Sequence, residues 1–462
     1  QALGERITSR GLGSRAQFGV RGVKIIVDDI PLTLADGQAQ TSNIDLGSTG
    51  QIEVIRGPSS SLYGNAAGGV IQLETQVLDK QQPLRLEARG MTGSYGLRKW
   101  QAKAMGNGEQ YNYTLNFSQT QSDGFRDHSA YKYLQLNTVA KYNLTSRLSL
   151  SGMLNYYNAP YLMNPSSLSK QDALNNPTKV RGFIVSQGAA EQPTQLQGGI
   201  TAKYQVNETG FTRVTVYGLG RTLINPIPGR IIDLHRNAGG IRTSYHSTFT
   251  LSQMPVQMIT GIDYEIQDDK RKEFENNGLP DGEVDSIVRD DIFKHLQYGE
   301  KLVDQQETVS GYGPFFQFEA GLLTNLNVQA GLRYDWYNFQ VDDQLLSSEV
   351  DQSGTRTMDQ LSPMIGINYL PYPNLSIYGN FSTAFQTPTS SELSNRPNGE
   401  GGFNPSLEPE RIRSVEAGAR GTLFSPRLRY NVTAFNMSIE NMIIPYQIAD
   451  PTSEEVFHEN AG

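Results

Sequence analysis

The sequence contains no cysteine among its 462 residues. This absence excludes disulfide bonds, zinc sites built from thiolates and catalysis by a cysteine thiol. It also lacks a strong excess of basic charge, with 39 Lys and Arg against 47 Asp and Glu and a net charge of -8. No long basic run is present, so nucleic acid is not expected as a partner.

Long apolar runs are missing as well, because only 37% of the residues are hydrophobic. No run approaches the roughly 18 apolar residues that a membrane-spanning helix needs. The longest apolar stretches, such as Val23–Val27, have the length of a strand. The sequence therefore excludes a helical membrane protein. It leaves open a β-barrel, whose strands need an apolar residue only at every second position.

From Leu84 onward, apolar and polar residues alternate. In Tyr111–Ser118 the aromatic and aliphatic side chains share one face, and Asn, Thr and Ser share the other. Leu326–Trp336 repeats the pattern. Alternation over about 9–11 residues is typical of a transmembrane strand with lipid on one side and a polar lumen on the other. It favours an outer-membrane barrel over the alternative, a large soluble β protein with strands of about 5–6 residues.

Short and long connections alternate along the same region. The short ones are Gly106–Gln110, Asn143–Arg147, Asn207–Gly210, Ser252–Pro255, Leu323–Asn325, Tyr372–Asn374 and Phe424–Arg427. The long, polar ones are Gln121–Ala130, Asn158–Pro193, Asn225–Gly239, Asp268–Glu307, Asp342–Arg356, Thr387–Glu410 and Pro445–Asn460. An antiparallel barrel produces this order because its turns lie at one rim and its loops at the other. The exception is the first hairpin, Ser94–Leu97, which is short where parity predicts a long loop.

About fifteen strands can be counted, the last at Arg427–Asn441. A closed bacterial barrel has an even number of strands. We therefore expect residues 81–462 to be an incomplete barrel whose C-terminal strands are missing.

Residues 1–80 have a different character. They are rich in glycine and contain short apolar runs at Val23–Val27, Ile52–Ile55 and Gly68–Thr75. Such runs predict short buried strands joined by tight turns. We expect a small compact domain, followed by a polar linker at about Gln76–Pro83.

Six segments resemble motifs of the TonB-dependent receptor family, in the order in which that family has them. They are ITSRGLGSR (Ile7–Arg15), RGVKIIVDDIP (Arg21–Pro31), IEVIRGPSSSLYGNAAGGVIQLET (Ile52–Thr75), FQTPTSSEL (Phe385–Leu393), NPSLEPERIRSVEAGAR (Asn404–Arg420) and FHENAG (Phe457–Gly462). One departure is Asp29, which stands where the family usually has glycine. We expect a locally altered turn there and no change of fold.

The resemblance implies an all-β membrane protein, a large antiparallel outer-membrane β-barrel of 22 strands when complete. An N-terminal α+β plug would lie in the lumen, because a barrel of that width cannot be filled by its own side chains. The implied activity is uptake of a scarce nutrient across a Gram-negative outer membrane. The implied partners are a small-molecule ligand, outer-membrane lipid and lipopolysaccharide, and TonB, which would bind a Ton box expected to be missing from this chain.

Within the family, Leu32–Ser48 looks most similar to the YncD branch, which implies pyrroloquinoline quinone as the ligand. The alternative is a ferric siderophore or ferric citrate, and a third is a passive pore or adhesion barrel. No cofactor, metal site or catalytic site can be assembled from the motifs, so an enzyme is not expected. The histidines show no metal-ligand spacing.

The resemblance also implies contacts between plug arginines and barrel glutamates. We expect Arg10 and Arg56 to contact the barrel, with Glu416 as the partner of Arg56; the alternative is that each is a solvated residue of the lumen. The motif residues Gly57, Tyr63, Gly64, Gly68 and Gly69 do not match the spacing of a phosphate-binding loop. We interpret these glycines as turn and packing residues.

The ligand is expected to rest on an apical plug loop that follows the turn at Pro31. Its candidate residues there are Asp36, Gln38, Gln40, Thr41 and Asn43, whose side chains can orient a polar ligand. Side chains from loops at the same rim would close over it and bind carboxylates. These side chains are Arg126, His128, Arg230 and His235. The alternative is that the plug loop only packs on the wall and that the loop residues are solvated.

Overall fold

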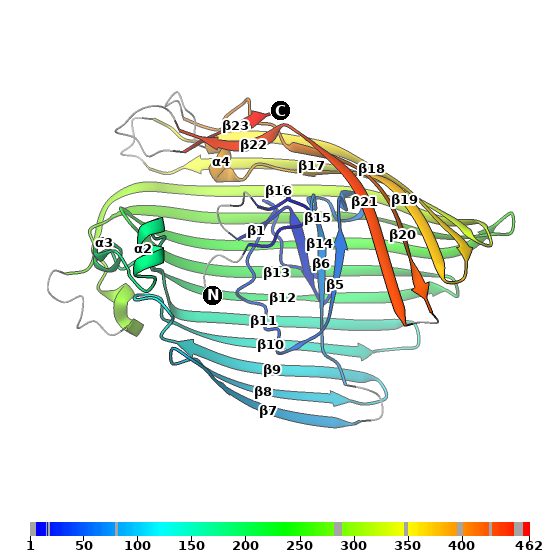
Figure 1. Ribbon diagram of the computed structural model, residues 1–462, viewed down its shortest axis with the longest axis horizontal. Coiled ribbons are helices and arrows are strands. Elements are labelled where there is room, and N and C mark those ends of the chain that lie inside the picture. The colour runs from blue at the N-terminus through cyan, green and yellow to red at the C-terminus, as the bar shows by residue number, and fades with distance from the viewer. Residues whose placement is uncertain are drawn as a thin grey trace.

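The computed structural model describes residues 6–14, 16, 19–78, 82–280, 289–345, 350–394, 401–424, 427–447 and 456–462. Two parts are visible in Figure 1: a curved sheet of long strands, and a small N-terminal part that lies on the concave side of that sheet. We call them the barrel sheet and the plug. No helix in the described residues is long and apolar enough to cross a membrane.

In the described residues the barrel sheet has 15 strands, as expected, and each strand pairs with the next one in the sequence. All the pairings between neighbouring strands are antiparallel. The strands are β7 (Leu84–Thr92), β8 (Arg98–Asn107), β9 (Tyr111–Ser122), β10 (Tyr131–Asn143), β11 (Leu148–Met163), β12 (Ala190–Asn207), β13 (Gly210–Ile227), β14 (Arg230–Leu251), β15 (Met254–Asn276), β16 (Tyr298–Leu323), β17 (Leu326–Asp343), β18 (Gly354–Tyr372), β19 (Leu375–Gln386), β20 (Glu410–Leu423) and β21 (Leu428–Glu440).

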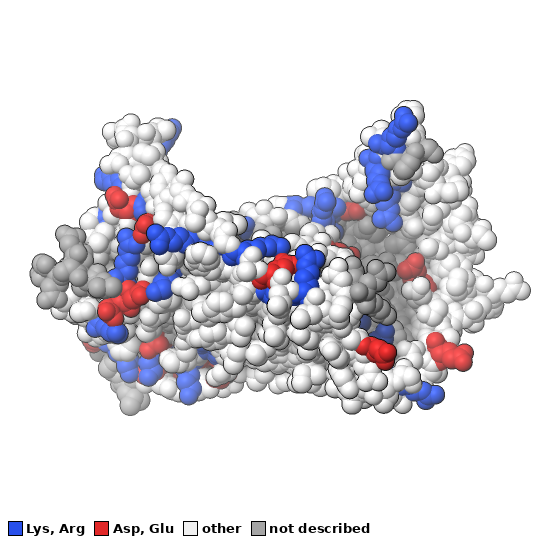
Figure 2. Space-filling model, turned by 90° about the horizontal axis from the view of Figure 1, so that it is seen from below, with Lys and Arg blue, Asp and Glu red and all other residues white. Residues whose placement is uncertain are grey.

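The two faces of the sheet are inverted relative to a soluble protein. In β17, Leu332 is 46% exposed on the convex face, whereas its neighbours Arg333 and Asp335 are buried on the concave face. The same inversion holds for Ile262 and Asp263 in β15. Figure 2 shows charged side chains gathered mainly in a band and toward the ends, with a broad uncharged area beneath them. This is the arrangement expected of a sheet with lipid outside and a polar lumen inside.

The short connections lie where the alternation predicts them, and several loops are shorter than expected. Residues 425–426 of the predicted connection Phe424–Arg427 lie outside the described residues. The expectation of a long loop at Asn225–Gly239 is wrong, because β13 and β14 continue to a tight turn at Pro228–Gly229. The polar composition of that segment indicates strands that rise beyond the membrane. The loop expected at Asn158–Pro193 begins later, contains α2 (Lys170–Asn175) and α3 (Gly182–Ser186), and ends at Ala190.

Two of the remaining loops also contain short helices. The loop after β15 contains a 3-10 helix at Arg289–Lys294, and the loop after β19 contains α4 (Ser390–Ser394). The segment expected as a loop at Pro445–Asn460 overlaps a hairpin of β22 (Met442–Tyr446) and β23 (Phe457–Ala461). Residues 448–455 lie outside the described residues.

The plug is built around a four-stranded sheet in the order β3-β2-β6-β5. Its elements are β1 (Val20–Arg21), β2 (Val23–Val27), β3 (Ile30–Pro31), β4 (Gln38–Ala39), β5 (Thr49–Arg56), α1 (Ser60–Tyr63) and β6 (Gly69–Thr75). Asp28 and Asp29 form the turn between β2 and β3 with φ of 49° and 69°. Two positive φ values are typical of a type I′ turn, so Asp29 is accommodated without a change of fold.

The inverted faces give a direct test on one strand. Replacing Leu332 with Arg would place a charge in the lipid, and we expect the full-length receptor to lose about 2–4 kcal/mol of unfolding free energy in vesicles. Gln329→Arg is the matched control, because Gln329 lines a polar cavity of about 400 Å³ in the lumen. Urea titration in lipid vesicles measures both. An equal loss in the two variants would contradict the assignment of the faces.

Candidate functional site

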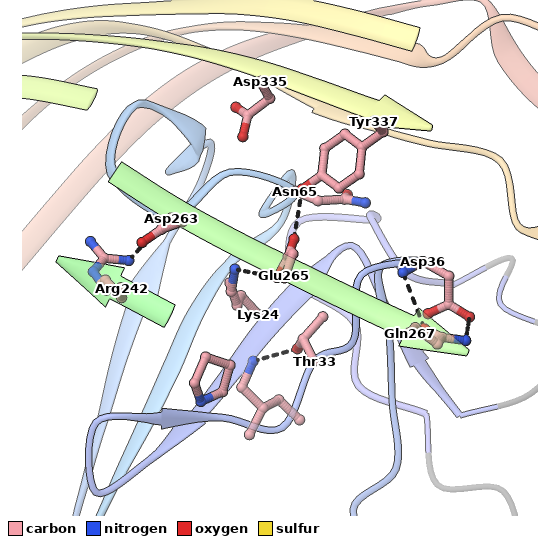
Figure 3. A network of polar contacts seen from close by, with 12 residues as sticks. Lys24, Thr33, Asp36, Asn65, Arg242, Asp263, Glu265, Gln267, Asp335 and Tyr337 are labelled. Atoms are coloured by element: carbon pink, nitrogen blue, oxygen red, sulfur yellow. Dashed lines mark hydrogen bonds and ion pairs between the residues drawn. The ribbon is translucent and has the colours of Figure 1, made fainter. Parts of the chain in front are cut away.

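A network of charged side chains in the lumen joins the plug to the barrel sheet (Figure 3). Arg333 contacts Asp263 at 2.6 Å and Asp335 at 2.8 Å. Arg242 contacts Asp263 at 3.2 Å and donates a hydrogen bond to the carbonyl of Leu62 in the plug at 3.1 Å. Because each buried charge has an opposite partner close by, the network can exist away from bulk water.

A second contact of this network comes from the plug strand β2. Lys24 lies 3.9 Å from Glu265, and the Tyr337 hydroxyl donates to Glu265 at 2.9 Å. The glycine of the motif at Gly64 has φ of 72°, and a Cβ there would lie 3.1 Å from Arg333. Gly64 therefore allows the plug backbone to approach the barrel charges closely.

The other motif residues serve turns and packing inside the plug. Gly69 has φ of 120°, and a Cβ there would lie 2.0 Å from the Ile55 carbonyl oxygen. Gly57 also has a positive φ, and Gly68 packs against Val23. The Tyr63 hydroxyl accepts a hydrogen bond from Gln72 at 3.0 Å. This geometry supports the interpretation of the glycines as turn and packing residues.

The partner of Glu416 is Arg10, at 2.5 Å, and the Arg10 guanidinium also lies 4.3 Å from the ring centre of Phe435. The expected pairing of Arg56 with Glu416 is wrong, since the described residues include both and show no ion pair between them. Arg56 ends the edge strand β5 and is exposed. The plug motifs contain both arginines, and Glu416 lies 360 residues or more further along the chain. The motifs alone therefore could not show which arginine reaches Glu416.

Asp45 is a plug carboxylate that the sequence analysis did not single out, and it is almost completely buried against β8 and β9. Its oxygens accept hydrogen bonds from Lys99 at 2.9 Å, Asn116 at 2.9 Å, Ser118 at 2.7 Å and the Gly47 N–H at 2.9 Å. Burial alone would raise the pKa of Asp45. The hydrogen bonds from Ser118, Lys99 and Gly47 outweigh burial and hold this pKa below its ordinary value.

The residues expected on the apical plug loop divide into two groups. Asp36 and Asn43 are buried in contacts with the wall, Asp36 with Gln267 at 3.2 Å and Asn43 with Asn155 and Gln197. Gln38 donates to Asp36 at 3.2 Å. By contrast, Gln40 and Thr41 line a large cavity. Only this second group is therefore placed to meet a ligand in the cavity.

The four loop-side residues do not converge over the plug loop. Arg126 donates to the carbonyls of Pro165, Ser166 and Lys179, so it joins the loop after β9 to the loop after β11. His128 bonds to the Ala189 carbonyl at 2.8 Å, and burial lowers its pKa, so it is neutral near pH 7. These contacts give Arg126 and His128 a structural role.

The other two residues lie on the strand β14. Arg230 is paired with Glu273 at 2.8 Å, and His235 is an exposed side chain 3.3 Å from Asp233. Neither lines the large cavity.

That cavity, of about 470 Å³, lies between the plug and the upper part of the wall. Its lining includes apolar plug residues, amide and hydroxyl groups of the apical loop, and barrel residues: Ile7, Gly19, Ile25, Gln40, Thr41, Ser42, Ile44, Leu46, Ile52, Val54, Ile71, Leu73, Tyr133, Gln135, Tyr157, Glu191, Arg221, Leu223 and Asn225. Among the described residues that line it, Arg221 is the one cationic side chain and Glu191 is the one anionic side chain. Arg221 donates to Gln195 at 3.4 Å and forms no ion pair within the described residues.

Arg221 was missed because the strand before the loop expected at Asn225 was not divided into residues that face the lumen and residues that face the lipid. The alternation of β13 was the signal that could have found it, since Arg221 lies in register with the lumen residues Thr215 and Tyr217. No group of three or more potential metal ligands occurs in the described part of the chain.

A wide polar lumen, an apolar outer wall and a small domain docked inside define a plugged transport barrel of the outer membrane. Residues 61–462 match the family described as TonB dependent receptor-like, beta-barrel, and residues 1–70 match the TonB-dependent Receptor Plug Domain. The chain therefore belongs to the TonB-dependent receptor family. Members of this family lie in the outer membrane of Gram-negative bacteria and are receptors and transporters, in agreement with the expectation that the chain is not an enzyme.

Individual relatives are distant. The chain is 24% identical to a hemin receptor of Yersinia enterocolitica, over 85% of this chain and 52% of that protein. It is 23% identical to the vitamin B12 transporter BtuB of Vibrio vulnificus, over 95% of this chain and 63% of that one. The unliganded ferric citrate transporter FecA superposes with a TM-score of 0.76 at 18% identity, covering 95% of this chain and 64% of that chain. The chain spans about half the length of the hemin receptors that it matches.

The Asp45 contact predicts a pH-dependent hold on the plug. Its lowered pKa means that its contribution is complete above the ordinary carboxyl value of 3.8 and is lost as the pH falls further. We expect Asp45→Asn to weaken plug docking by about 1.5–3 kcal/mol at neutral pH, and the difference from the parent to shrink as the pH falls below 3.8. Urea titration of the full-length receptor, followed by proteolysis of the released plug, measures this.

Asp29→Asn is the matched control, because Asp29 is a half-exposed plug carboxylate 3.2 Å from Arg213. Such an exposed pair contributes little to stability. If Asp29→Asn released the plug as readily as Asp45→Asn, the hold would not depend on the buried carboxylate.

Proposed function

We propose that the chain forms the ligand-binding part of a TonB-dependent receptor that takes up a carboxylate-bearing iron complex. The observation that carries the proposal is the cavity between the plug and the wall, with a cation at Arg221 that forms no ion pair in the described residues. Glu191 lines the same cavity and attracts Arg221, but the two side chains form no ion pair in the described residues. The Arg221 guanidinium is therefore suited to bind a ligand carboxylate with two parallel hydrogen bonds.

The rest of the cavity sets further limits on the ligand. Tyr133, Tyr157 and Leu223 offer apolar and aromatic surface on the wall, and Gln40 and Thr41 offer hydrogen bonds from the plug. A ligand that fits is therefore anionic at one end and otherwise apolar or planar, which is usual for small-molecule sites. The names of the relatives supply two carboxylate-bearing iron compounds, hemin and ferric citrate, of which hemin has the planar, apolar part.

Pyrroloquinoline quinone, the ligand first expected, also carries carboxylates and a planar ring. None of the relatives reported above carries it in its name, so we propose the iron complexes ahead of it. A passive pore is a weaker alternative, because the plug is held in the lumen by the contacts of Arg10, Lys24 and Asp45. A plug that is held by polar contacts and fills the lumen needs an external source of work to move, and TonB is the proposed source.

Binding measurements on Arg221 test the proposal. In the full-length receptor, Arg221→Ala removes charge-assisted hydrogen bonds worth about 1.5–3 kcal/mol, so the affinity for the true ligand should fall about ten- to a hundredfold. Calorimetry with hemin, ferric citrate and pyrroloquinoline quinone, each titrated separately, identifies which compound binds. Arg230→Ala is the control, because Arg230 lies outside the cavity and is paired with Glu273. Unchanged affinity in Arg221→Ala for the compound that binds the parent would place the site elsewhere.

A further inference from the structure

The motif FQTPTSSEL at Phe385–Leu393 has no part in the cavity, yet the structure places it directly against the plug. It begins at the end of β19 and continues into α4, within the loop 387–409 that connects β19 to β20. The loop is at the same rim as α2 and α3 (Figure 1), which is the extracellular rim of a barrel whose short turns lie at the opposite end.

Arg21 of the plug strand β1 makes the central contact with this segment. Its guanidinium is buried, donates through Nη2 to the Thr387 carbonyl at 2.7 Å and forms an ion pair through Nη1 with Glu392 of α4. The second oxygen of Glu392 accepts a hydrogen bond from the Thr389 N–H at 2.9 Å. The carboxylate therefore fixes the first turn of α4 and the plug arginine at the same time.

Two further contacts support the one at Arg21. Asn65 of the plug donates to the Thr387 hydroxyl at 3.0 Å. Leu393 of α4 is fully buried in an apolar cluster that also contains Ala35 of the apical plug loop and Phe385. We call the four polar residues Arg21, Asn65, Thr387 and Glu392 the Arg21 brace.

The partners of the brace distinguish it from the other charged contacts of the plug. Arg10, Lys24 and Asp45 contact Glu416, Glu265 and Lys99, all of which lie on strands of the barrel wall. Such strands are fixed by hydrogen bonds on both sides. Arg21 instead contacts a loop, which lacks this ladder and can change position at a lower free-energy cost.

We propose that the Arg21 brace couples the plug to residues 387–394, the part of the extracellular loop that follows β19. With the brace intact, the plug holds this segment against the lumen. When the plug is displaced, Arg21 leaves Glu392 and Thr387, and the segment is released at the rim. Arg21 is a positioning residue in this proposal, because it acts on the loop and does not line the ligand cavity. The consequence for uptake rests on the proposed function, whereas the coupling itself does not.

Hydrogen exchange on the full-length receptor tests the coupling without a ligand. Arg21→Ala should speed amide exchange in a peptide covering 387–394 by about ten- to a hundredfold, the factor that corresponds to losing a charge-assisted hydrogen bond from a local opening equilibrium. Arg10→Ala is the matched control, because it removes another plug arginine from a barrel carboxylate that lies on a strand. Equal exchange in peptide 387–394 for the two variants would overturn the proposal.

A second measurement separates positioning from general loss of structure. With hemin or ferric citrate as the probe, whichever binds the parent, Arg21→Ala should keep the binding constant within about twofold while the uptake rate falls about tenfold. Exchanging the charges, with Arg21→Glu and Glu392→Arg together, should slow the exchange of peptide 387–394 again relative to Arg21→Ala. Failure of both probes to bind the parent would contradict the proposed function and leave the exchange result to decide the coupling. Loss of binding in parallel with uptake, or no rescue by the exchanged pair, would contradict the positioning role.

Discussion

The structure depends on one constraint: a sheet in lipid must satisfy its backbone groups within itself and present apolar side chains outward. The 15 antiparallel strands meet the first demand through their ladders, and residues such as Leu332 and Ile365 meet the second. Since side chains alternate along a strand, the other half must face the lumen. The interior is therefore rich in hydrogen-bonding and charged groups, and everything that docks there has to match them.

The plug matches the lumen with polar contacts at separate points of the wall. Asp45 contacts β8 and β9, Lys24 contacts β15 and Arg10 contacts β20. Buried ion pairs contribute little net stability when compared with apolar packing of the same volume, but they are costly to leave half-made. A plug held in this way is well defined in position. On release, water can hydrogen-bond to the polar groups that the wall leaves.

The ligand cavity follows from the same arrangement. The apical loop reaches the wall through Asp36 and Asn43, and this contact leaves space beside Gln40 and Thr41. Apolar plug residues and the tyrosines of β10 and β11 close that space, with Arg221 and Glu191 as its two charged side chains among the described residues. Arg230 is paired with Glu273 and does not line this cavity.

The sequence by itself determined the class of fold, because the information is local. Alternation sets the faces of each strand, short polar segments set the turns, and glycines such as Gly64 mark places where backbones approach closely. Tertiary structure alone decided which distant residues meet. Arg10 rather than Arg56 reaches Glu416. Arg126 and His128 form hydrogen bonds with backbone carbonyls of the loops. Arg21 contacts Glu392 across 371 positions. Such pairings depend on the curvature of the sheet and the position of the plug within it, and neither is encoded in the spacing of any one segment.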